Sequence, residues 1–481
     1  MIPRGQAGFL VSGKEWKDGA ALEVRSPWDQ KLVGTVTVAT RNDARHAVDG
    51  LVASFRKTRV LPSYARQQIL LNMVTQVAAQ ADAFVRVLVA EAGKPVVAAR
   101  IEVERTLSVL RTAAEESMRL GGEVLPLDLT PGNNGRWGML RRFPVGPVLA
   151  VTPFNYPLLL VAHKLAPAIA CGCPVLIKPS PQTPYAAIAL AKIAIAAGWP
   201  EEAIAVMPLA NEDTAWLAEK EERIKLLSFT GSASVGWQLK ARSGRKRVVL
   251  ELGGNSAMIV HSDWRDLDLA AAKAAAGAFG YAGQSCISVQ RIFVERDIYQ
   301  TFLWKVVERA EKLMLGDPAL ENTEVGPLVR PSEAERVEKW IQEAVSEGAK
   351  LVTGGTRVGS LVAPTVLTGT KASMKIREEE VFGPVVSIEP YEEFEQALSE
   401  VNHSRFGLQA GLFTRNIDRI LEAYEQLEVG AVLVGESPSW RMDPMPYGGT
   451  RESGMGREGV RWAMQEMTEP RLLAVAGKIY R

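Results

Sequence analysis

The 481-residue chain is poor in cysteine and histidine, with three of the first and four of the second. Three cysteines cannot form the disulfide framework of a secreted domain, and they suit a reducing compartment. One residue separates Cys171 from Cys173, whereas about two to four residues separate the paired cysteine ligands of a zinc site. The four histidines are scattered along the chain. We therefore expect a cytoplasmic protein with no structural metal.

The chain also lacks an excess of charge. Its 56 basic and 55 acidic residues give a formal net charge of +1, which does not favour nucleic acid or an anionic membrane as a partner. The first residues lack the charged and apolar regions of a signal peptide. The most apolar segment, Leu158 to Cys171, contains His163 and Lys164 and is shorter than the ~20 residues that span a bilayer. The expected partner is a small molecule.

What the chain does contain is length enough for two or three domains and a clear alternation of elements. Between residues 147 and 261, short apolar strands alternate with helices, and this pattern is typical of βαβ units around a parallel sheet. The expected strands are 148–151, 175–177, 203–207, 225–229 and 248–252. An α/β fold with a Rossmann-like, doubly wound nucleotide-binding domain is predicted.

The rest of the chain divides around this domain. Short strands are expected over residues 1–40, followed by three helices and then by a polar hairpin at 123–146. That hairpin is too isolated to be stable alone, and residues 471–476 are a candidate partner strand. A second α/β series runs from 263 to about 440. We predict a cofactor-binding domain (1–118 and 147–252), a catalytic α/β domain (253–440), a small oligomerisation element (119–146 and 464–481) and a return to the cofactor domain (441–463).

Cys286, in the stretch Gly283-Gln284-Ser285-Cys286-Ile287-Ser288, is the candidate nucleophile. A lone cysteine is more often a buried apolar residue, as we expect for Cys171 and Cys173. The interpretation therefore needs an oxyanion partner, a base and an electron acceptor from elsewhere in the chain.

Two segments offer the oxyanion partner and the base. Asn155 lies between Pro153 and Pro157 at a strand end, which restricts its backbone and suits an oxyanion hole, although an N-cap is the alternative. Glu251 ends a strand before Gly253 and can serve as a general base, or it is a solvent-facing glutamate at a sheet edge.

The electron acceptor would bind at the carboxyl ends of the same strands. Gly231, Ser232 and Gly236 surround a strand-to-helix junction, where free backbone amides favour phosphate, although a plain glycine-rich cap fits as well. Lys178 and Ser180 follow a neighbouring strand. Lys178 suits an adenosine ribose hydroxyl, or it is a solvated lysine.

Several motifs, in their order and spacing, resemble the aldehyde dehydrogenase superfamily across nearly the whole chain. They are Pro153-Phe154-Asn155-Tyr156-Pro157, Phe229 to Gly236, Glu251-Leu252-Gly253-Gly254-Asn255, Gly283-Gln284-Ser285-Cys286, Glu379-Glu380-Val381-Phe382-Gly383-Pro384, and Pro446-Tyr447-Gly448-Gly449 with Ser453-Gly454.

The resemblance implies an NAD(P)-dependent oxidation of an aldehyde to its carboxylic acid. Cys286 would form a thiohemiacetal whose oxyanion is held by the Asn155 amide and the Cys286 N–H, and Glu251 would activate the water that hydrolyses the thioester. Helix-opening contexts and a nearby carboxylate favour a reactive thiolate. The implied cofactor contacts are Thr152, Pro153, Lys178, Ser180, Gly231, Ser232, Gly236, Leu252, Glu380 and Phe382.

Departures from the family pattern bear on specificity. Members that prefer NAD often carry a glutamate three residues after the lysine, and here that position is Pro181, which favours NADP or dual use. Ser285 and Ile287 flank the nucleophile, and Arg441 is a candidate for binding a carboxylate or phosphate of the substrate, or else a surface arginine paired with Asp443.

Two other functions stay open at this stage, a coenzyme A-acylating relative and a non-catalytic binding protein with the same fold. The presence of Glu251 argues against the first. The predicted hairpin favours a homodimer or homotetramer.

Overall fold

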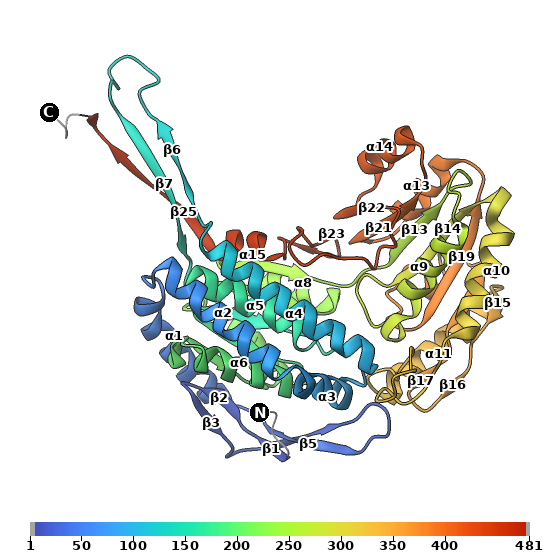
Figure 1. Cartoon of the computed structure of the whole chain (residues 1–481), viewed down its shortest axis with the longest axis horizontal. Helices are drawn as coiled ribbons and strands as arrows, with labels where there is room; N and C mark the ends of the chain where they lie inside the picture. Colours follow the sequence, from blue (N-terminus) through green and yellow to red (C-terminus); the bar gives the residue numbers. More distant parts are fainter. Residues whose placement is uncertain (1–4, 478–481) are drawn as a thin grey trace.

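The computed structural model describes residues 5–477. Two lobes, each built on a mostly parallel sheet with helices on both faces, lie side by side, and a long three-stranded arm projects from the first lobe (Figure 1). The α/β, Rossmann-like fold class predicted from the sequence is confirmed.

The first lobe contains an eight-stranded sheet in the order β24-β12-β11-β8-β9-β10-β2-β3. The five strands from β12 to β10 in this order are parallel to one another, whereas β24 and β2 pair with them antiparallel. Its strands are β2 (Phe9–Val11), β3 (Lys14–Trp16), β8 (Val148–Val151), β9 (Val175–Lys178), β10 (Ile204–Val206), β11 (Leu226–Thr230), β12 (Arg247–Glu251) and β24 (Gly454–Met455). The observed strands agree with the predicted ones to within a residue or two.

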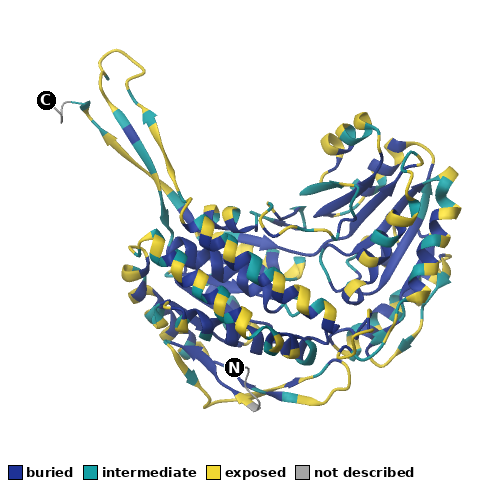
Figure 2. Ribbon diagram, viewed as in Figure 1, coloured by how far each residue is buried: buried dark blue, intermediate teal, exposed yellow. Residues whose placement is uncertain are grey.

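Alternate residues of these strands enter two different cores. Val148 and Ala150 pack with helices on one face, whereas Leu149 and Val151 pack with helices on the other. Because both faces are covered, every residue of the central strands β8, β9 and β10 is buried (Figure 2). The helices of this lobe are α1 (Arg41–Thr58), α2 (Ser63–Ala79), α3 (Ala81–Ala92), α4 (Val96–Ser117), α5 (Leu159–Cys171), α6 (Tyr185–Ala196), α7 (Asn211–Glu219), α8 (Ala233–Arg242) and α15 (Val460–Glu466).

The expectation of three helices before the hairpin is wrong, because there are four. α2 ends at Ala79 and α3 begins at Ala81, with Gln80 between them at φ −114° and ψ 15°. The break bends the chain by 71°. No glycine or proline marks it in the sequence, so the helical periodicity gave no sign of it.

The second lobe contains a seven-stranded sheet in the order β15-β18-β19-β14-β13-β21-β22, parallel except for β15. Its strands are β13 (Ser256–Val260), β14 (Val289–Glu295), β15 (Lys350–Thr353), β18 (Thr365–Thr368), β19 (Val385–Tyr391), β21 (Gln409–Phe413) and β22 (Ala431–Val434). Its helices are α9 (Leu267–Phe279), α10 (Arg296–Lys312), α11 (Pro331–Ser346), α12 (Lys375–Glu378), α13 (Phe394–Asn402) and α14 (Ile417–Gln426).

Smaller sheets complete the fold. β1 (Gly5–Ala7), β5 (Leu32–Thr37) and β4 (Ala21–Arg25) form one of them. The pairs β16 (Arg357–Val358) with β17 (Leu361–Val362) and β20 (Phe406–Gly407) with β23 (Thr450–Arg451) form two more.

The connection between the lobes positions the site. β12 of the first sheet ends at Glu251, and β13 of the second begins at Ser256. Only residues 252–255 separate them, so the carboxyl end of the first sheet faces the second lobe. Ligands of open α/β sheets bind at that end of the strands.

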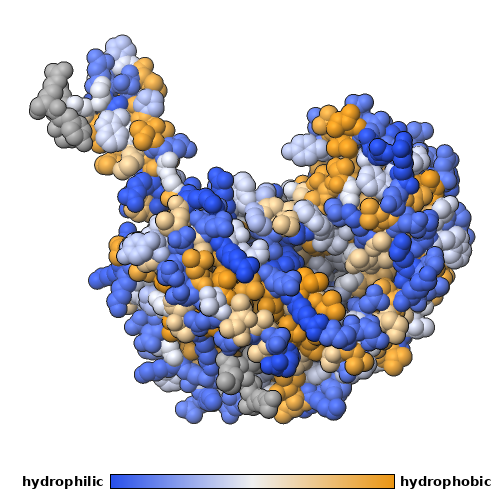
Figure 3. All heavy atoms as spheres, viewed as in Figure 1, coloured by the Kyte–Doolittle hydropathy of each residue, from blue (hydrophilic) through white to orange (hydrophobic). Residues whose placement is uncertain are grey.

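The arm is the hairpin β6 (Gly122–Pro126) and β7 (Trp137–Pro144), with β25 (Thr468–Val475) paired along the whole of β7. The expected partner strand is therefore present. Polar and apolar side chains are mixed over the arm's surface, including exposed Val124, Leu129, Leu472 and Leu473 (Figure 3). The domain boundaries stay a prediction, and residues 478–481 of the predicted oligomerisation element lie outside the described residues.

Among residues 5–477, no single helix is long and apolar enough to cross a membrane. The bent pair of α2 and α3 reaches that length and composition only when the two helices are counted together.

Candidate active site

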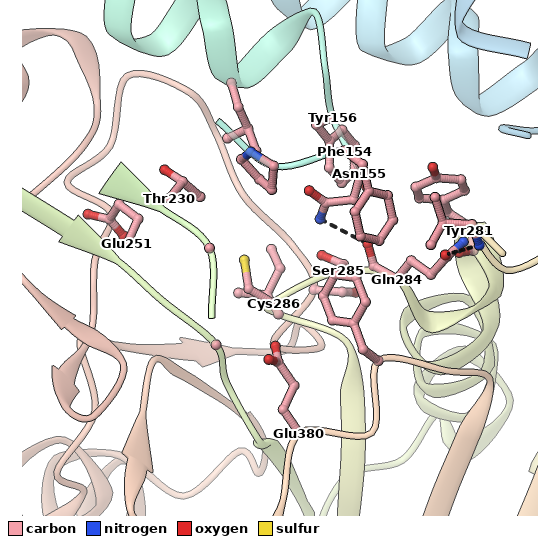
Figure 4. Close-up of a pocket in the computed structure, with 18 of the residues that line it drawn as sticks. Phe154, Asn155, Tyr156, Thr230, Glu251, Tyr281, Gln284, Ser285, Cys286 and Glu380 are labelled. Atoms are coloured by element: carbon pink, nitrogen blue, oxygen red, sulfur yellow. Dashed lines mark hydrogen bonds between the residues drawn. The ribbon is translucent and has the colours of Figure 1, made fainter. Parts of the chain in front are cut away.

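Cys286 lies just before β14, at the amino end of a strand in the second sheet, and faces the first lobe. It lines a cavity of about 880 Å³ together with Asn155, Glu251 and Glu380. Figure 4 shows these side chains from both lobes around one open space, with the sulfur between Asn155 and Glu380. The three residues predicted to be catalytic are therefore brought together.

The backbone before the nucleophile is unusual. Tyr281 and Ala282 have φ of 50° and 53°, and Gly283 continues at 69°. Such values cost free energy in residues other than glycine and collect at functional sites. Gly254, from the Glu251 motif, passes so close that a Cβ there would collide with the carbonyl oxygen of Cys286. The glycines that the motifs share thus fix where the sulfur lies.

Burial of Cys286 opposes the thiolate, and the reactive thiolate expected from the sequence stays a prediction. Burial raises the pKa of the thiol to about 12, although a hydrogen bond to Tyr447 opposes the rise. The Cys286 Sγ and Tyr447 Oη lie 2.8 Å apart. Since no helix N-terminus or close cation outweighs the desolvation, Cys286 is a neutral thiol in this state.

Asn155 is almost fully buried and held in place. Its Nδ2 donates to the Gln284 carbonyl at 3.0 Å, which leaves the second N–H of the amide for another acceptor. The loop itself is anchored because the Glu102 carboxylate accepts the backbone N–H groups of Leu158 and Leu159, the start of α5. The amide is thus a fixed donor beside the sulfur, as an oxyanion hole requires.

Glu251 is 3% exposed, and neither carboxylate oxygen has a hydrogen-bond partner among the described residues. Burial raises the pKa of this carboxyl well above its usual range, and the charge of Glu458 adds to the rise. The alternative of a solvent-facing glutamate is therefore wrong. A buried carboxylate with a raised pKa is a stronger base than one in water.

Several predicted cofactor residues lie along the carboxyl edge of the first sheet. Thr152 follows β8, Lys178 ends β9 and Ser180 lies two residues beyond, all of them less than 9% exposed. The hydroxyl of Thr152 has no hydrogen-bond partner among the described residues. Burial lowers the pKa of Lys178, and no described carboxylate forms an ion pair with it. A solvated lysine is thus the wrong alternative, and these polar groups fit a ligand that supplies their partners.

The junction of β11 and α8 offers donors for an anion. Gly231 and Ser232 line the cavity, and Ser232 precedes α8 without capping it through its side chain. The first backbone N–H groups of the helix are free for phosphate oxygens. Gly236 instead packs its Cα against Leu252, where a Cβ would collide. It thereby lets the helix approach the sheet, and its contact with the cofactor stays a prediction.

The opposite wall of the cavity comes from the second lobe. Glu380 accepts the Gly254 N–H at 3.1 Å, and burial raises the pKa of its carboxyl to about 7. Phe382 has φ of 49° and its ring meets that of Phe154 edge-on. Together with Pro153 and Leu252, these residues surround a space whose polar groups and glycines fit a dinucleotide. No group of three or more metal-ligating side chains is found in residues 5–477.

Ser285, Ile287 and Arg441 all line the cavity, as predicted for a substrate pocket. The alternative of a surface arginine is wrong, whereas the pairing with Asp443 that it included is present as a long ion pair. The Arg441 side chain is only 6% exposed, and its Nε is 4.0 Å from Asp443, too far for a hydrogen bond. Its guanidinium stacks on the Tyr447 ring at 3.7 Å.

Sequence reasoning missed Arg105 and His163. Arg105, on α4, lines the cavity and donates to both oxygens of Asp443, at 3.1 and 2.7 Å. His163 Nε2 lies 3.1 Å from Asp443 and 3.3 Å from Arg441. His163 belongs to none of the motifs, so nothing in the sequence indicated this position.

A buried ion pair behind Glu251 was missed as well. Lys164 donates to Glu458 at 3.0 Å and to Ser228 at 2.9 Å. A lysine inside an apolar helix was the available signal, because such a charge needs a partner.

Comparisons with known proteins agree with this geometry. The family model described as "Aldehyde dehydrogenase family" matches residues 15–473. The chain is 41% identical to 3-sulfolactaldehyde dehydrogenase of Priestia aryabhattai over 98% of both chains. It superposes on aldehyde dehydrogenase 21 from Physcomitrella patens, solved with the reaction product succinate, with a TM-score of 0.97, 38% identity and 100% of both chains covered.

A further structural neighbour is glyceraldehyde-3-phosphate dehydrogenase from Methanocaldococcus jannaschii, complexed with NADP. The TM-score is 0.91 at 36% identity, covering 95% of this chain and 99% of that one. The motifs, the fold and these matches agree, and the chain belongs to the aldehyde dehydrogenase family, as an NAD(P)-dependent enzyme that oxidises aldehydes to carboxylic acids.

Proposed function

We propose that the enzyme oxidises short aldehydes that carry an anionic group at their other end, and that Arg441 binds this group. The observation that supports the proposal is the state of Arg441. It lines the same cavity as Cys286, its side chain is 6% exposed, and its Nε has no acceptor among the described residues.

The carboxylates near Arg441 are already engaged. Asp443 accepts two hydrogen bonds from Arg105, and Glu458 accepts one from Lys164. Arg441 approaches Glu458 no closer than 3.6 Å and Asp443 no closer than 4.0 Å. A desolvated guanidinium whose Nε has no acceptor and whose other close contact is the His163 ring nitrogen favours an incoming anion, because a bidentate carboxylate, sulfonate or phosphate satisfies it.

Tyr447 limits the length of the substrate. Arg441 stacks on the face of its ring, and the Cys286 sulfur contacts its hydroxyl. The anion and the aldehyde carbon are therefore separated by roughly the size of one tyrosine side chain, which corresponds to a chain of a few carbon atoms. The similar proteins named above act on or contain sulfolactaldehyde, succinate and glyceraldehyde 3-phosphate, all short and anionic.

The roles of the catalytic residues are part of the proposal. Glu251 accepts the proton of the Cys286 thiol and passes it to solvent, the sulfur adds to the aldehyde carbon, and the oxyanion accepts hydrogen bonds from Asn155 Nδ2 and the Cys286 N–H. A nicotinamide cofactor, held by residues such as Lys178, Ser232 and Glu380, would supply the acceptor for the hydride that leaves this carbon. Glu251 then removes a proton from the water that attacks the thioester, and the acid leaves.

For the cofactor, we propose NADP or the use of both dinucleotides. Pro181 stands where a glutamate would repel a 2′-phosphate, and Lys178 lies at the end of β9 without a described anionic partner. Initial rates with NAD and NADP at equal concentration test this, and a strong preference for NAD would contradict it.

The decisive experiment is a matched aldehyde panel with both cofactors. Succinate semialdehyde should be oxidised with a kcat/KM about 10- to 150-fold above butanal or lactaldehyde, because a hydrogen bond to a charged group contributes about 1.5–3 kcal/mol. Arg441→Gln should remove most of this preference while changing butanal oxidation less than about threefold. Equal activity on both classes in the wild type would refute the anionic substrate, and a panel without any turnover would refute the proposed reaction.

Two controls complete the panel. Cys286→Ala should abolish turnover of every aldehyde. A requirement for coenzyme A would instead identify the acylating alternative, in which a thiol and not water releases the acyl group.

We also propose a homodimer or homotetramer assembled through the arm of β6, β7 and β25. The apolar side chains Val124 and Leu129 on this arm are 73% and 79% exposed, and contact with a second subunit would remove them from water. Light scattering that gives a monodisperse monomer would exclude this assembly.

A further inference from the structure

A second cavity, of about 470 Å³, lies at the foot of the arm, away from the substrate cavity. Its walls are the turn between α1 and α2, the first turn of α2, the base of β6 and β7, and the end of α5 at Cys171. None of its lining residues also lines the substrate cavity. We call it the arginine pocket, after the four arginines that line it: Arg59, Arg66, Arg141 and Arg142.

The arginine pocket carries positive charge without compensation. No aspartate or glutamate lines it, and none of its four arginines forms an ion pair within residues 5–477. Arg59 and Arg141 lie over the rings of Phe55 and Phe143, and Arg142 donates to backbone and hydroxyl oxygens near Thr468. Four like charges around one cavity repel one another, so an anion placed among them is stabilised.

Arg66 is the most informative of the four. It is 8% exposed, and its one hydrogen bond in the described part of the chain runs from a terminal nitrogen to Ser63 Oγ at 3.1 Å. Its Nε is buried without an acceptor. Burial lowers the pKa of this guanidinium, and the groups that oppose the change are thiols, not carboxylates.

A structural arginine in this protein looks different. Arg291, 2% exposed, donates from all three of its nitrogens to the carbonyls of Asn255, Glu400 and Val401. Its hydrogen-bonding capacity is used by the fold. That of Arg66 is not, and a buried donor of this kind is costly unless a ligand satisfies it.

The start of α2 points to the same kind of ligand. This 17-residue helix begins at Ser63 after Pro62, with no side-chain cap and no acidic residue in its first turn. Pro62 and Ser63 both line the pocket. The free N–H groups and the positive end of the helix dipole favour an anion where the arginines also converge.

We propose that the arginine pocket binds the phosphate group of a small metabolite. A planar guanidinium pairs well with phosphate oxygens, and a helix N-terminus adds backbone donors to the same group. The volume exceeds what a bare phosphate needs and falls within the range of about 300–1,000 Å³ that small-molecule sites occupy. Inorganic phosphate and phosphate monoesters share this chemistry, and the experiment separates them.

The test is isothermal titration calorimetry on the full-length protein at low ionic strength. Inorganic phosphate and glycerol 3-phosphate are titrated in parallel, with glycerol as the uncharged control. We expect both anions to bind, glycerol 3-phosphate more tightly, and glycerol not at all. Binding of inorganic phosphate alone would keep the anion site and reject the ester as its ligand.

Variants test whether the measured heat of binding comes from the arginine pocket. Arg66→Gln and the exposed Arg59→Gln should each weaken binding at least tenfold, since each removes charged donors. Arg56→Gln is the matched control, because it removes an exposed α1 arginine that does not line the pocket. Because Arg441 is itself proposed to bind anions, the titrations are repeated in the Arg441→Gln background, where the heat that remains and that Arg66→Gln removes belongs to the arginine pocket.

Three results would overturn the proposal. The first is the absence of binding by the wild type. The second is binding that Arg66→Gln and Arg59→Gln leave intact, which would place the anion elsewhere. The third is the absence of binding together with dissociation of the Arg66→Gln protein in light scattering, which would assign the pocket to an acidic side chain of a second copy.

Discussion

Removing the hydroxyl of Tyr447 should make Cys286 less reactive. The Cys286 Sγ and Tyr447 Oη are 2.8 Å apart, and this contact lowers a thiol pKa that burial raises to about 12. Tyr447→Phe keeps the ring under Arg441 and the surrounding packing, so the change isolates one hydrogen bond. A hydrogen bond to a charged group contributes about 1.5–3 kcal/mol, and one pKa unit corresponds to about 1.4 kcal/mol. The pKa of Cys286 should therefore rise by about one to two units.

The consequence is measurable at ordinary pH. Well below the pKa, the thiolate fraction falls tenfold for each unit by which the pKa rises. The rate constant for alkylation of Cys286 by iodoacetamide should thus drop about 10- to 100-fold in Tyr447→Phe at every pH from 7 to 9. Quantifying the Cys286 peptide by mass spectrometry gives the rate. Cys171 and Cys173, fully buried and with raised pKa values, serve as internal unreactive controls.

The sign of the effect tests the direction of the hydrogen bond. If Tyr447 only accepts a proton from the neutral thiol, its removal destabilises the thiol and lowers the pKa, so alkylation becomes faster. An unchanged or increased rate in Tyr447→Phe would therefore refute the view that Tyr447 stabilises the thiolate.

Three further predictions concern the same site. Glu251→Gln should release about one equivalent of reduced nicotinamide per active site in a stopped-flow burst and then turn over at least ~100-fold more slowly, because a general base contributes about 10²–10⁴; a steady-state rate like that of the wild type would contradict its role. Gly254→Ala should fold, as seen by circular dichroism, but lose about 100-fold in kcat, since the new Cβ collides with the Cys286 carbonyl oxygen and displaces the sulfur. Burial alone would raise the pKa of Asp443, but hydrogen bonds from His163 and Arg105 hold it below its usual range. The stability that this lowered pKa provides is present above the unfolded pKa of about 3.9 and is lost as the pH falls below that value. In urea denaturation, Asp443→Asn should therefore be less stable than the wild type at pH 7, and the difference should be smaller near pH 3.

The parallel sheet and the position of Cys286 could be predicted because local patterns carry them. A short run such as Val148 to Val151, apolar at every position, is typical of a strand buried on both faces, and the structure places its alternate residues in two cores. The glycines of the Glu251 motif likewise mark close approaches of backbone, and Gly254 does lie against Cys286. At such a position glycine has one physical explanation, the lack of room for a Cβ atom.

The environment of Arg441 could not be predicted in this way. Asp443 is two residues from Arg441, and the sequence alone makes them natural partners. In the fold, that carboxylate instead accepts hydrogen bonds from Arg105, which is 338 positions away in the sequence. Cys286 shows the same limit, because a motif reveals a reactive residue type but not the burial that decides its protonation. Such properties depend on which distant elements meet.

The hydrogen-bond partners of a buried arginine indicate whether it serves the fold or a ligand. Taking a guanidinium out of water costs several kcal/mol, and the fold offsets this cost only where acceptors are supplied. Arg291 has its carbonyls and Arg105 has Asp443, so both are accounted for by the protein itself. Arg441 and Arg66 are also buried, yet each keeps an Nε without an acceptor and lines a cavity. Arg377 also keeps a buried Nε without an acceptor, but it lines neither cavity. The combination of an unsatisfied donor with a cavity therefore distinguishes Arg441 and Arg66, and we assign their missing acceptors to ligands, an anionic aldehyde at the first and a phosphate group at the second.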